Sequence, residues 1–545
     1  MNVYETFDTL YVKRPTRWLL VILVAYAIVA VGFAIQTPRW QAPDEPAHYN
    51  YIAHIANELS LPVLKLGDYN HTYLGQLVTT RFPPNFSVAS LRYESYQPPL
   101  YYLTAAPIFW LSDGRVLILR LYNVFIGALT LIALYRTITL IFPKKHLIGL
   151  TATAFAALLP MHVAMDAAIN NDGFAELLVI TSLLILLTWM KAYMETEVNG
   201  EDAVLNDRRT LILLGIVLGL GLLTKIYAYA MVPISALAIV LVTYWRHHLQ
   251  KGEMRSFLLG VQKSLWTIVP AILLGLPLWI RNLRNYGGLD FLGLQWHDKV
   301  VIGQPTTESW INTFGWVAYW ERAFSFTFKS FWGVFGWLAV FMDERIYTMM
   351  LVFTGVLFLG WLWSMVRFIS GKPDSDLTPF QVAAMLLLVV VLLAVTASYI
   401  WYNTKFVQHQ GRYFFWGLVA ISTIVALGWR ELLHPLQGTI TAFLAFVLAV
   451  ALGVTGTING SLDKWAVLFI SMVGALLLLQ PLLLSNTDSY TIEWLPQPIR
   501  TLIRSQPVSG IMTMLRLTVW MIPFLFLFLL DLLIPIVYIM PQTLP

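Results

Sequence analysis

Cysteine is absent from the 545-residue chain, and charged residues are scarce. Without cysteine the chain can form no disulfide, no thiolate nucleophile and no cysteine-ligated metal site. Asp, Glu, Lys and Arg make up 12% of the residues, about half the share found in a typical soluble domain. So little charge cannot cover a soluble body of this size, which excludes a soluble cytosolic enzyme. Disorder is excluded as well, because disordered chains are poor in aromatic residues and aromatic residues reach 14% here.

Several nucleotide- and metal-binding motifs are also missing from the sequence. There is no Walker A phosphate loop, no dinucleotide-binding glycine fingerprint and no HExxH helix, which disfavours ATP-driven transport, nicotinamide chemistry and a zinc protease. The formal net charge is +5, but its Lys and Arg residues are scattered between apolar runs. Membrane topology explains that distribution better than nucleic-acid binding does.

Long apolar runs dominate what is present. A membrane-spanning helix needs about 20 mostly apolar residues, and the chain contains about 13 such runs. They are 18–36, 116–141, 147–166, 173–192, 209–224, 226–245, 264–282, 347–366, 379–400, 412–428, 439–458, 465–484 and 516–540. The first run is too long for a signal-peptide core and has no small-residue cleavage site after it, so we expect an uncleaved span. The sequence therefore predicts an all-α, polytopic transmembrane helical bundle.

One proline-containing segment decides the predicted topology. Residues 97–112 are apolar but short for a span, and they contain three prolines. If they do not span, basic turns such as Lys144-Lys145 lie on the same side as the N-terminus, as the positive-inside rule requires. We therefore expect an interfacial helix at 97–112 and two long external loops, at about 37–115 and 283–346. Loops of this length are usually functional, and we expect them to pack together over a cavity open to the outer leaflet.

Two carboxylates and an imidazole follow the first predicted span. Asp44 and Glu45 precede Pro46, a pattern that suits the start of a helix, and His48 lies four residues after Asp44, on the same helical face. Capping of the helix by acidic side chains is one reading of this pattern. A general base held at the membrane surface is the other.

A second acidic site, Asp172, follows two asparagines at the outer mouth of the third and fourth spans. Capping of the next helix is the alternative role for it. If Asp44 and Asp172 converge, they could hold Mg²⁺ or Mn²⁺, or lysine and arginine could supply the positive charge instead. The need for a metal cofactor therefore stays open.

Basic residues at the external ends of spans are candidates for binding a phosphate. Lys225 lies between two apolar runs, where a charge is costly and indicates function, although a snorkelling lysine would also fit. Arg412 begins a span and could bind a phosphate bidentately or anchor the helix at the interface. Arg281 and Arg284 end a span outside, against the topology rule, which favours a phosphate role, and His409 precedes Arg412 by three residues.

The order of these motifs resembles the GT-C superfamily of integral-membrane glycosyltransferases. The motifs are Asp44-Glu45, Pro98–Tyr102, Arg120–Asn123, Asp172, Thr224-Lys225 and Gln410–Tyr413. The closest resemblance is to the bacterial branch with the aminoarabinose transferases and to the protein O-mannosyltransferases, over about residues 15–430. It predicts a GT-C-like transmembrane catalytic region in 1–430, while 431–545 are C-terminal transmembrane helices without a recognisable motif. The Trp-Trp-Asp motif of oligosaccharyltransferases is missing, which disfavours transfer to an Asn sequon.

The resemblance implies a donor sugar on a polyprenyl phosphate and a role for each motif. By similarity, Asp44 is the base or metal ligand with Glu45 beside it, and Asp172 is the second acidic residue. Lys225 and Arg412 resemble phosphate contacts, and Arg120 is similar in position to an arginine of the mannosyltransferases. The expected acceptor is a lipid, glycan or protein, and the expected location is the cytoplasmic (plasma) membrane with an extracytoplasmic active site. The competing hypotheses are a lipid or polysaccharide transporter or ligase, and a non-catalytic scaffold subunit.

Overall fold

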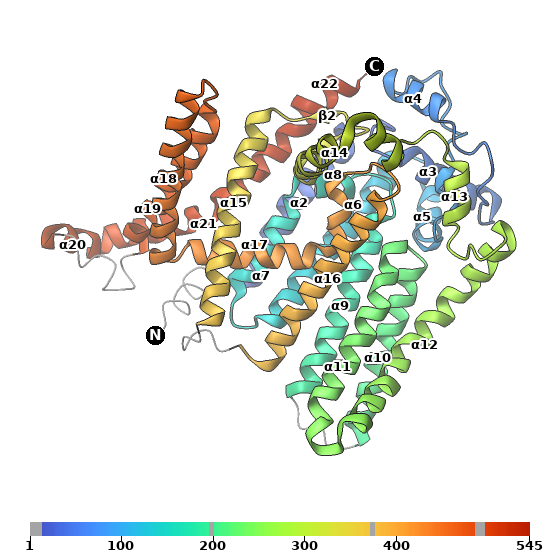
Figure 1. The fold of residues 1–545 in the computed structure, drawn as a ribbon, viewed down its shortest axis with the longest axis horizontal. Coiled ribbons are helices and arrows are strands. Elements are labelled where there is room, and N and C mark those ends of the chain that lie inside the picture. The colour runs from blue at the N-terminus through green and yellow to red at the C-terminus, as the bar shows by residue number, and fades with distance from the viewer. Residues whose placement is uncertain (1–13, 196–200, 371–376, 485–495, 545) are drawn as a thin grey trace.

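The chain is almost entirely helical in its computed structural model, which describes residues 14–195, 201–370, 377–484 and 496–544 (Figure 1). The only sheet in these ranges is a hairpin of two short antiparallel strands, β1 (Val334–Phe335) and β2 (Val340–Phe341). An all-helical design suits lipid, because each helix satisfies its own backbone hydrogen bonds.

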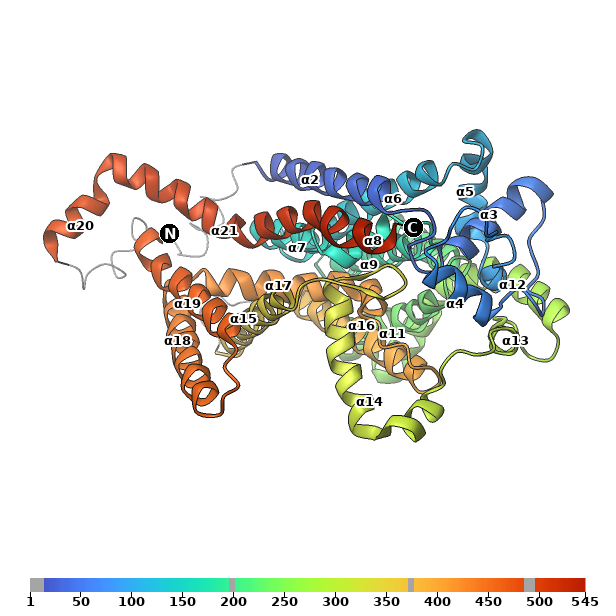
Figure 2. The same cartoon turned by 90° about the horizontal axis from the view of Figure 1, so that it is seen from above.

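Ten of the described helices are long and apolar enough to cross a membrane, which confirms the predicted polytopic all-α bundle. They are α2 (Pro15–Gln36), α6 (Val116–Ile141), α9 (Asp172–Glu195), α11 (Met231–Lys251) with η2 (Ile226–Ala230), α12 (Glu253–Tyr286), α15 (Glu344–Ile369), α16 (Pro379–Asn403), α17 (Leu418–Leu432) with η4 (Gly411–Gly417), α18 (Pro435–Ile458), and α21 (Gln506–Ile534), which continues through η6 (Pro535–Ile539) into α22 (Met540–Thr543). Helix α17 lies in the middle of the bundle (Figure 2), and 72% of the apolar stretch that it forms with η4 is buried.

This count is lower than the 13 spans expected from the sequence. The predicted span 147–166 is broken into α7 (His146–Ala157) and α8 (Pro160–Asp166), which meet at 66°, and counting this pair as one span gives 11. The predicted span 209–224 lies in α10 (Glu201–Leu222), whose first half is charged and leaves too short an apolar run. Helix α19 (Lys464–Leu484) qualifies only as a shorter apolar helix, over Lys464–Leu478.

The two long loops carry short helices of their own. The first holds α3 (Glu45–Glu58), α4 (His71–Thr79), η1 (Tyr93–Tyr96) and α5 (Leu100–Leu111); the second holds α13 (Leu294–Val300) and α14 (Thr307–Trp332). As predicted for 97–112, α5 is too short to span, and it packs against α3. A further short helix, α20 (Gln497–Arg504), precedes α21.

The two loops contact each other, as the sequence predicted. The indole nitrogen of Trp296 donates to the carbonyl of Leu64 at 2.8 Å, and that of Trp337 donates to the carbonyl of Trp40 at 2.9 Å. The loops are thereby fixed together over one end of the bundle (Figures 1 and 2).

Candidate active site

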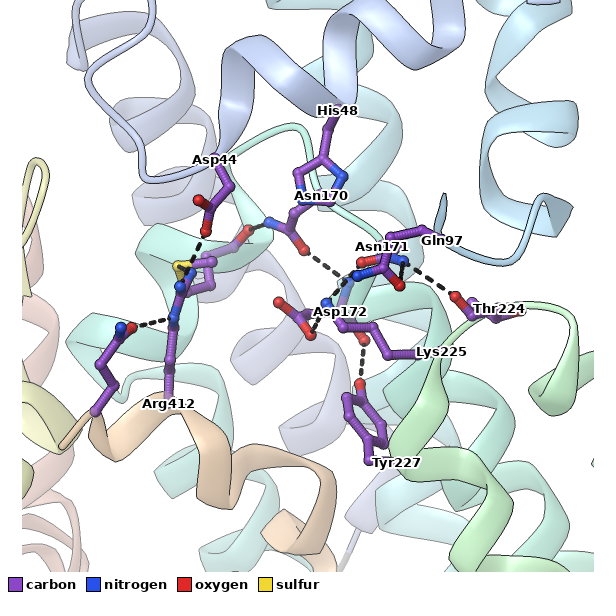
Figure 3. A network of polar contacts seen from close by, with 12 residues as sticks. Asp44, His48, Gln97, Asn170, Asn171, Asp172, Thr224, Lys225, Tyr227 and Arg412 are labelled. Carbon is purple, nitrogen blue, oxygen red and sulfur yellow. Dashed lines mark hydrogen bonds and ion pairs between the residues drawn. The ribbon is translucent and has the colours of Figure 1, made fainter. Parts of the chain in front are cut away.

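A cavity of about 550 Å³ lies where the two loops meet the helix ends. Its lining comes from both loops and from α8, α9, η2, α16 and η4. The ionisable side chains in its lining include Asp44, His48, Glu94, His162, Asp166, Asp172, Glu176, Lys225 and Arg412. Five residues predicted from the sequence are therefore brought together: Asp44, His48, Asp172, Lys225 and Arg412 (Figure 3).

Asp44 points into this cavity instead of capping the helix that follows it. It precedes α3 in a left-handed conformation, with φ 65°, and makes no side-chain capping hydrogen bond. The Tyr93 hydroxyl donates to Oδ1 at 3.0 Å, and Arg412 Nη2 donates to Oδ2 at 3.1 Å. The side chain of Asp44 stays 30% exposed, so a ligand in the cavity can reach it.

The electrostatics keep Asp44 ionised and His48 neutral. Burial alone would raise the pKa of Asp44, but the nearby guanidinium of Arg412 outweighs it and holds the pKa below its ordinary value. Burial lowers the pKa of His48, whose Nδ1 lies 2.8 Å from the Tyr102 hydroxyl oxygen. The site thus offers an anionic acceptor beside an uncharged imidazole.

Asp172 forms a second carboxylate–cation pair. Lys225 Nζ lies 2.8 Å from Asp172 Oδ1 and also donates to Asn171 Oδ1 at 2.7 Å. The Asn171 amide donates to the Thr224 carbonyl at 3.0 Å, and the Tyr227 hydroxyl donates to the Asp172 carbonyl at 3.0 Å (Figure 3). These bonds fix the start of α9 to the junction between α10 and η2. Lys225 and Asp172 remain 19% and 35% exposed.

Arg412 lies opposite, at the start of η4, with its side chain 11% exposed. Its Nε donates to Gln410 Oε1 at 2.6 Å, which orients the guanidinium toward Asp44 (Figure 3). Arg412 and Lys225 therefore present two positive charges to one chamber.

Glu45 and Arg120, in contrast, do not line the cavity. Arg120 binds the carboxylate of Glu45 bidentately, with Nε–Oε1 and Nη2–Oε2 distances of 2.7 Å, and both side chains are almost fully buried. Arg120 also donates to the carbonyls of Ala34, Thr37 and Pro38. This pair joins the end of α2, the start of α3 and α6, so the structure gives it a scaffolding position.

Three more predicted phosphate ligands also lie outside the cavity lining. Arg281 donates to the carbonyls of Leu61 and Pro62, while Arg284 is exposed at the end of α12. His409 is buried with its ring 4.7 Å from that of Tyr319. Burial and the neighbouring Arg322 lower the pKa of His409 to about 4, so its ring is uncharged.

Sequence reasoning missed other polar residues of the lining. Tyr93 and Glu94 lie just before the Pro-Pro segment, in η1. Glu176 lies one turn after Asp172 and pairs with His162, whose Nε2 is 3.2 Å from Glu176 Oε2. An acidic residue inside a predicted span was the available signal for Glu176, because such residues are rare and usually functional.

The described residues form no complete set of side-chain ligands for a metal ion. No group of three or more His, Asp or Glu side chains within the described ranges could hold one. Asp44 and Asp172 each contact a cationic side chain, so each carboxylate must give up that contact to bind Mg²⁺, which proteins commonly hold with one or two carboxylates, waters and substrate phosphates.

Comparison with known proteins supports the motif analysis. The profile of the family described as dolichyl-phosphate-mannose-protein mannosyltransferase matches residues 74–292. The resemblance to GT-C membrane glycosyltransferases is thereby confirmed, and the chain is a multi-pass membrane protein. No curated protein matches the chain.

Two kinds of solved structure are similar at low identity. The oligosaccharyltransferase of Archaeoglobus fulgidus, tethered with an acceptor peptide, is 13% identical with a TM-score of 0.43; the match covers 93% of this chain and 56% of that one. ArnT from Cupriavidus metallidurans, bound to undecaprenyl phosphate, is 14% identical with a TM-score of 0.44, over 96% of this chain and 77% of that one. The present chain thus spans little more than half the length of the archaeal enzyme.

Proposed function

We propose that this chain is a membrane glycosyltransferase that moves a sugar from a polyprenyl-phosphate donor to an acceptor nucleophile. One observation carries the proposal: two carboxylate–cation pairs, Asp44–Arg412 and Asp172–Lys225, line a single cavity. Dolichyl phosphate mannose, which is named in the matching family's description, is a donor of this chemical class.

The two cations suit the leaving group of such a reaction. When the bond between the sugar carbon and the phosphate oxygen breaks, negative charge grows on the phosphate. Arg412 and Lys225 stabilise that charge in the transition state, and arginine can bind two phosphate oxygens at once. Both side chains are partly exposed, so they can exchange a carboxylate contact for a phosphate contact.

Asp44 suits the role of base. The acceptor oxygen forms a bond to the sugar carbon as the phosphate departs, and its proton passes to Asp44. Because Arg412 keeps the pKa of Asp44 low, Asp44 is a weak base. A weak base suffices in an oxocarbenium-like transition state, because the attacking hydroxyl becomes acidic as its new bond forms.

The basic turns support an extracytoplasmic site in the plasma membrane. Lys144-Lys145 follow the end of α6, and Arg208-Arg209 lie in the first half of α10, in both cases away from the cavity. Since Lys and Arg are enriched in cytoplasmic loops, the cavity faces the other side. The acceptor on that side is a lipid, a glycan or a protein.

Turnover of a polyprenyl-phosphate sugar by the purified wild type and by Asp44→Asn tests the proposal. We expect Asp44→Asn to lower the rate by about 100-fold or more. Asp113→Asn is a matched control, because Asp113 has the same left-handed backbone, with φ 55°, yet is exposed and outside the cavity lining. Equal rates for wild type and Asp44→Asn remove Asp44 from the mechanism. Movement of the intact donor between leaflets without cleavage indicates a transporter, and donor binding without turnover indicates a scaffold.

A further inference from the structure

A second layer of ionisable residues forms the floor of the cavity. Glu176 lies one turn deeper on α9 than Asp172, and His162 and Asp166 lie on α8. His162 Nδ1 lies 2.9 Å from the Ala156 carbonyl oxygen and its Nε2 lies 3.2 Å from Glu176 Oε2. On the other side, the Tyr26 hydroxyl donates to Asp166 Oδ2 at 2.9 Å. The proposed reaction uses none of these side chains.

Glu176 keeps one acceptor atom without a partner. Its side chain is almost fully buried, and Oε1 has no hydrogen-bond partner among the described residues. Since the Ala156 carbonyl can only accept, His162 Nδ1 is the donor there, and one proton is shared between His162 Nε2 and Glu176 Oε2. In either position of that proton, Oε1 remains an acceptor. A buried acceptor of this kind is costly unless a ligand donates to it.

Aromatic rings complete the floor. Tyr227 and Trp416 both line the cavity and stack in parallel, with centroids 5.7 Å apart and planes 9° apart. Phe415 meets the ring of His162 edge-on at 5.4 Å. A pocket of aromatic faces with a few fixed polar atoms is typical of small-molecule recognition. It suits a sugar, whose C–H groups pack on rings and whose hydroxyls donate to carboxylates.

Other parts of a polyprenyl-phosphate donor fit this floor poorly. An apolar chain would leave Glu176 Oε1 without a hydrogen-bond partner, at a cost in free energy. A phosphate would meet two carboxylates at short range, and neither contacts a lysine or arginine in the described ranges. The phosphate instead fits above the floor, where it can contact Lys225 and Arg412.

We infer that this floor, formed by His162, Asp166, Glu176, Tyr227 and Trp416, binds the sugar ring of the donor, and that Glu176 Oε1 accepts a hydrogen bond from a ring hydroxyl. The inference rests on the proposed function and assigns Glu176 as a residue that determines sugar specificity. The hydroxyl that it contacts must lie on the part of the ring that faces away from the phosphate.

Binding of donors with and without the sugar tests this assignment. The probes are undecaprenyl phosphate alone and undecaprenyl phosphate carrying mannose, glucose, galactose or arabinose, measured on the full chain in lipid nanodiscs. Glu176→Met removes the acceptor at similar length. We expect it to weaken the tightest sugar-carrying probe by about 10-fold and to leave undecaprenyl phosphate within about 2-fold of the wild type. Glu176→Gln, which retains an oxygen, restores most of the loss.

Two further variants separate recognition from folding. Tyr26→Phe removes the bond to Asp166 from outside the cavity lining, and should keep the preference for the sugar-carrying probe. Trp416→Leu removes the ring platform and should lose that preference, which also provides the test if Glu176→Met does not fold.

Three results overturn the inference. They are equal weakening of both kinds of probe by Glu176→Met, no weakening of either, and a wild type that binds no sugar-carrying probe more tightly than undecaprenyl phosphate. A wild type that binds neither kind of probe overturns the proposed function, and the inference with it.

Discussion

Arg412 and Asp44 are separated by 368 positions in the chain, yet Arg412 Nη2 lies 3.1 Å from Asp44 Oδ2. The first long loop and the start of η4 therefore complete one site. The pair also sets the charge state of the proposed base, because Arg412 lowers the pKa that burial alone would raise. Each partner thus has a measurable effect on the other.

Replacing Arg412 should lower kcat/KM strongly and leave the free energy of unfolding nearly unchanged. We expect Arg412→Gln to lower kcat/KM by about 100-fold, because one preorganised charge at the leaving phosphate is lost. Arg412→Lys keeps the charge but cannot bind the phosphate bidentately, so its decrease in kcat/KM should be intermediate. Arg284→Gln is the matched control, since Arg284 is exposed and outside the cavity lining. Steady-state turnover of all three variants provides the measurement, and equal losses in Arg412→Gln and Arg284→Gln would contradict this assignment.

The pH dependence of turnover should reveal the effect of Arg412 on the ionisation of Asp44. Asp44 must be ionised to accept a proton, and its pKa lies below the ordinary 3.8. The wild-type rate should therefore stay flat as the pH falls from 7 to about 5. His48 adds no step near 6.5, because burial lowers its pKa and it is already neutral there. In Arg412→Gln the raising effect of burial is no longer offset, so the acid limb of kcat/KM moves to higher pH. An unchanged limb in that variant means that Asp44 is not the titrating base.

Parts of this site followed directly from the sequence. Spans are local features, because each helix closes its own hydrogen bonds, and polar residues at their ends stand out against apolar runs. Asp44, Asp172, Lys225 and Arg412 were found in that way. The opposite orientations of Asp44 and Glu45 were not, because they depend on a left-handed backbone at Asp44 and on Arg120 contacting Glu45 from α6.

The same limit explains the other differences from the sequence analysis. The break between α7 and α8 places His162 and Asp166 at the cavity floor. Pro160 and the ionisable residues inside the predicted span 147–166 were the local signals of this break, but the mean hydropathy of the run favoured a single span. Arg281 donates a hydrogen bond to a backbone carbonyl of the first loop. This contact joins segments that are far apart in the sequence, so no local pattern predicts it. Hydropathy reports which segments enter the bilayer, but the direction in which each terminal side chain points is a tertiary property.

The Asp172–Lys225 pair should matter more for activity than for stability. Both side chains are partly exposed, so solvent screens their attraction, and the pair contributes at most about 1 kcal/mol to folding. A double-mutant cycle of Asp172→Asn and Lys225→Met, followed by thermal unfolding in detergent, measures that coupling. Lys225→Met alone should still lower kcat/KM by at least about 10-fold, because it removes a proposed phosphate contact. A large coupling in stability together with unchanged turnover would make the pair structural.

The Glu45–Arg120 pair should show the reverse behaviour. Both side chains are almost fully buried and joined bidentately, so removing one partner leaves an uncompensated buried charge. We expect Glu45→Gln and Arg120→Met each to lower the free energy of unfolding by about 3–5 kcal/mol. Asp44→Asn changes the neighbouring residue, but Asp44 lies at the edge of a water-accessible cavity, so its melting temperature should stay close to that of the wild type. Melting in detergent and turnover per folded molecule, measured on the same samples, then separate the two members of the acidic pair: Glu45→Gln loses stability, and Asp44→Asn loses rate. If Asp44→Asn is the less stable variant, the division between a scaffolding glutamate and a catalytic aspartate is wrong.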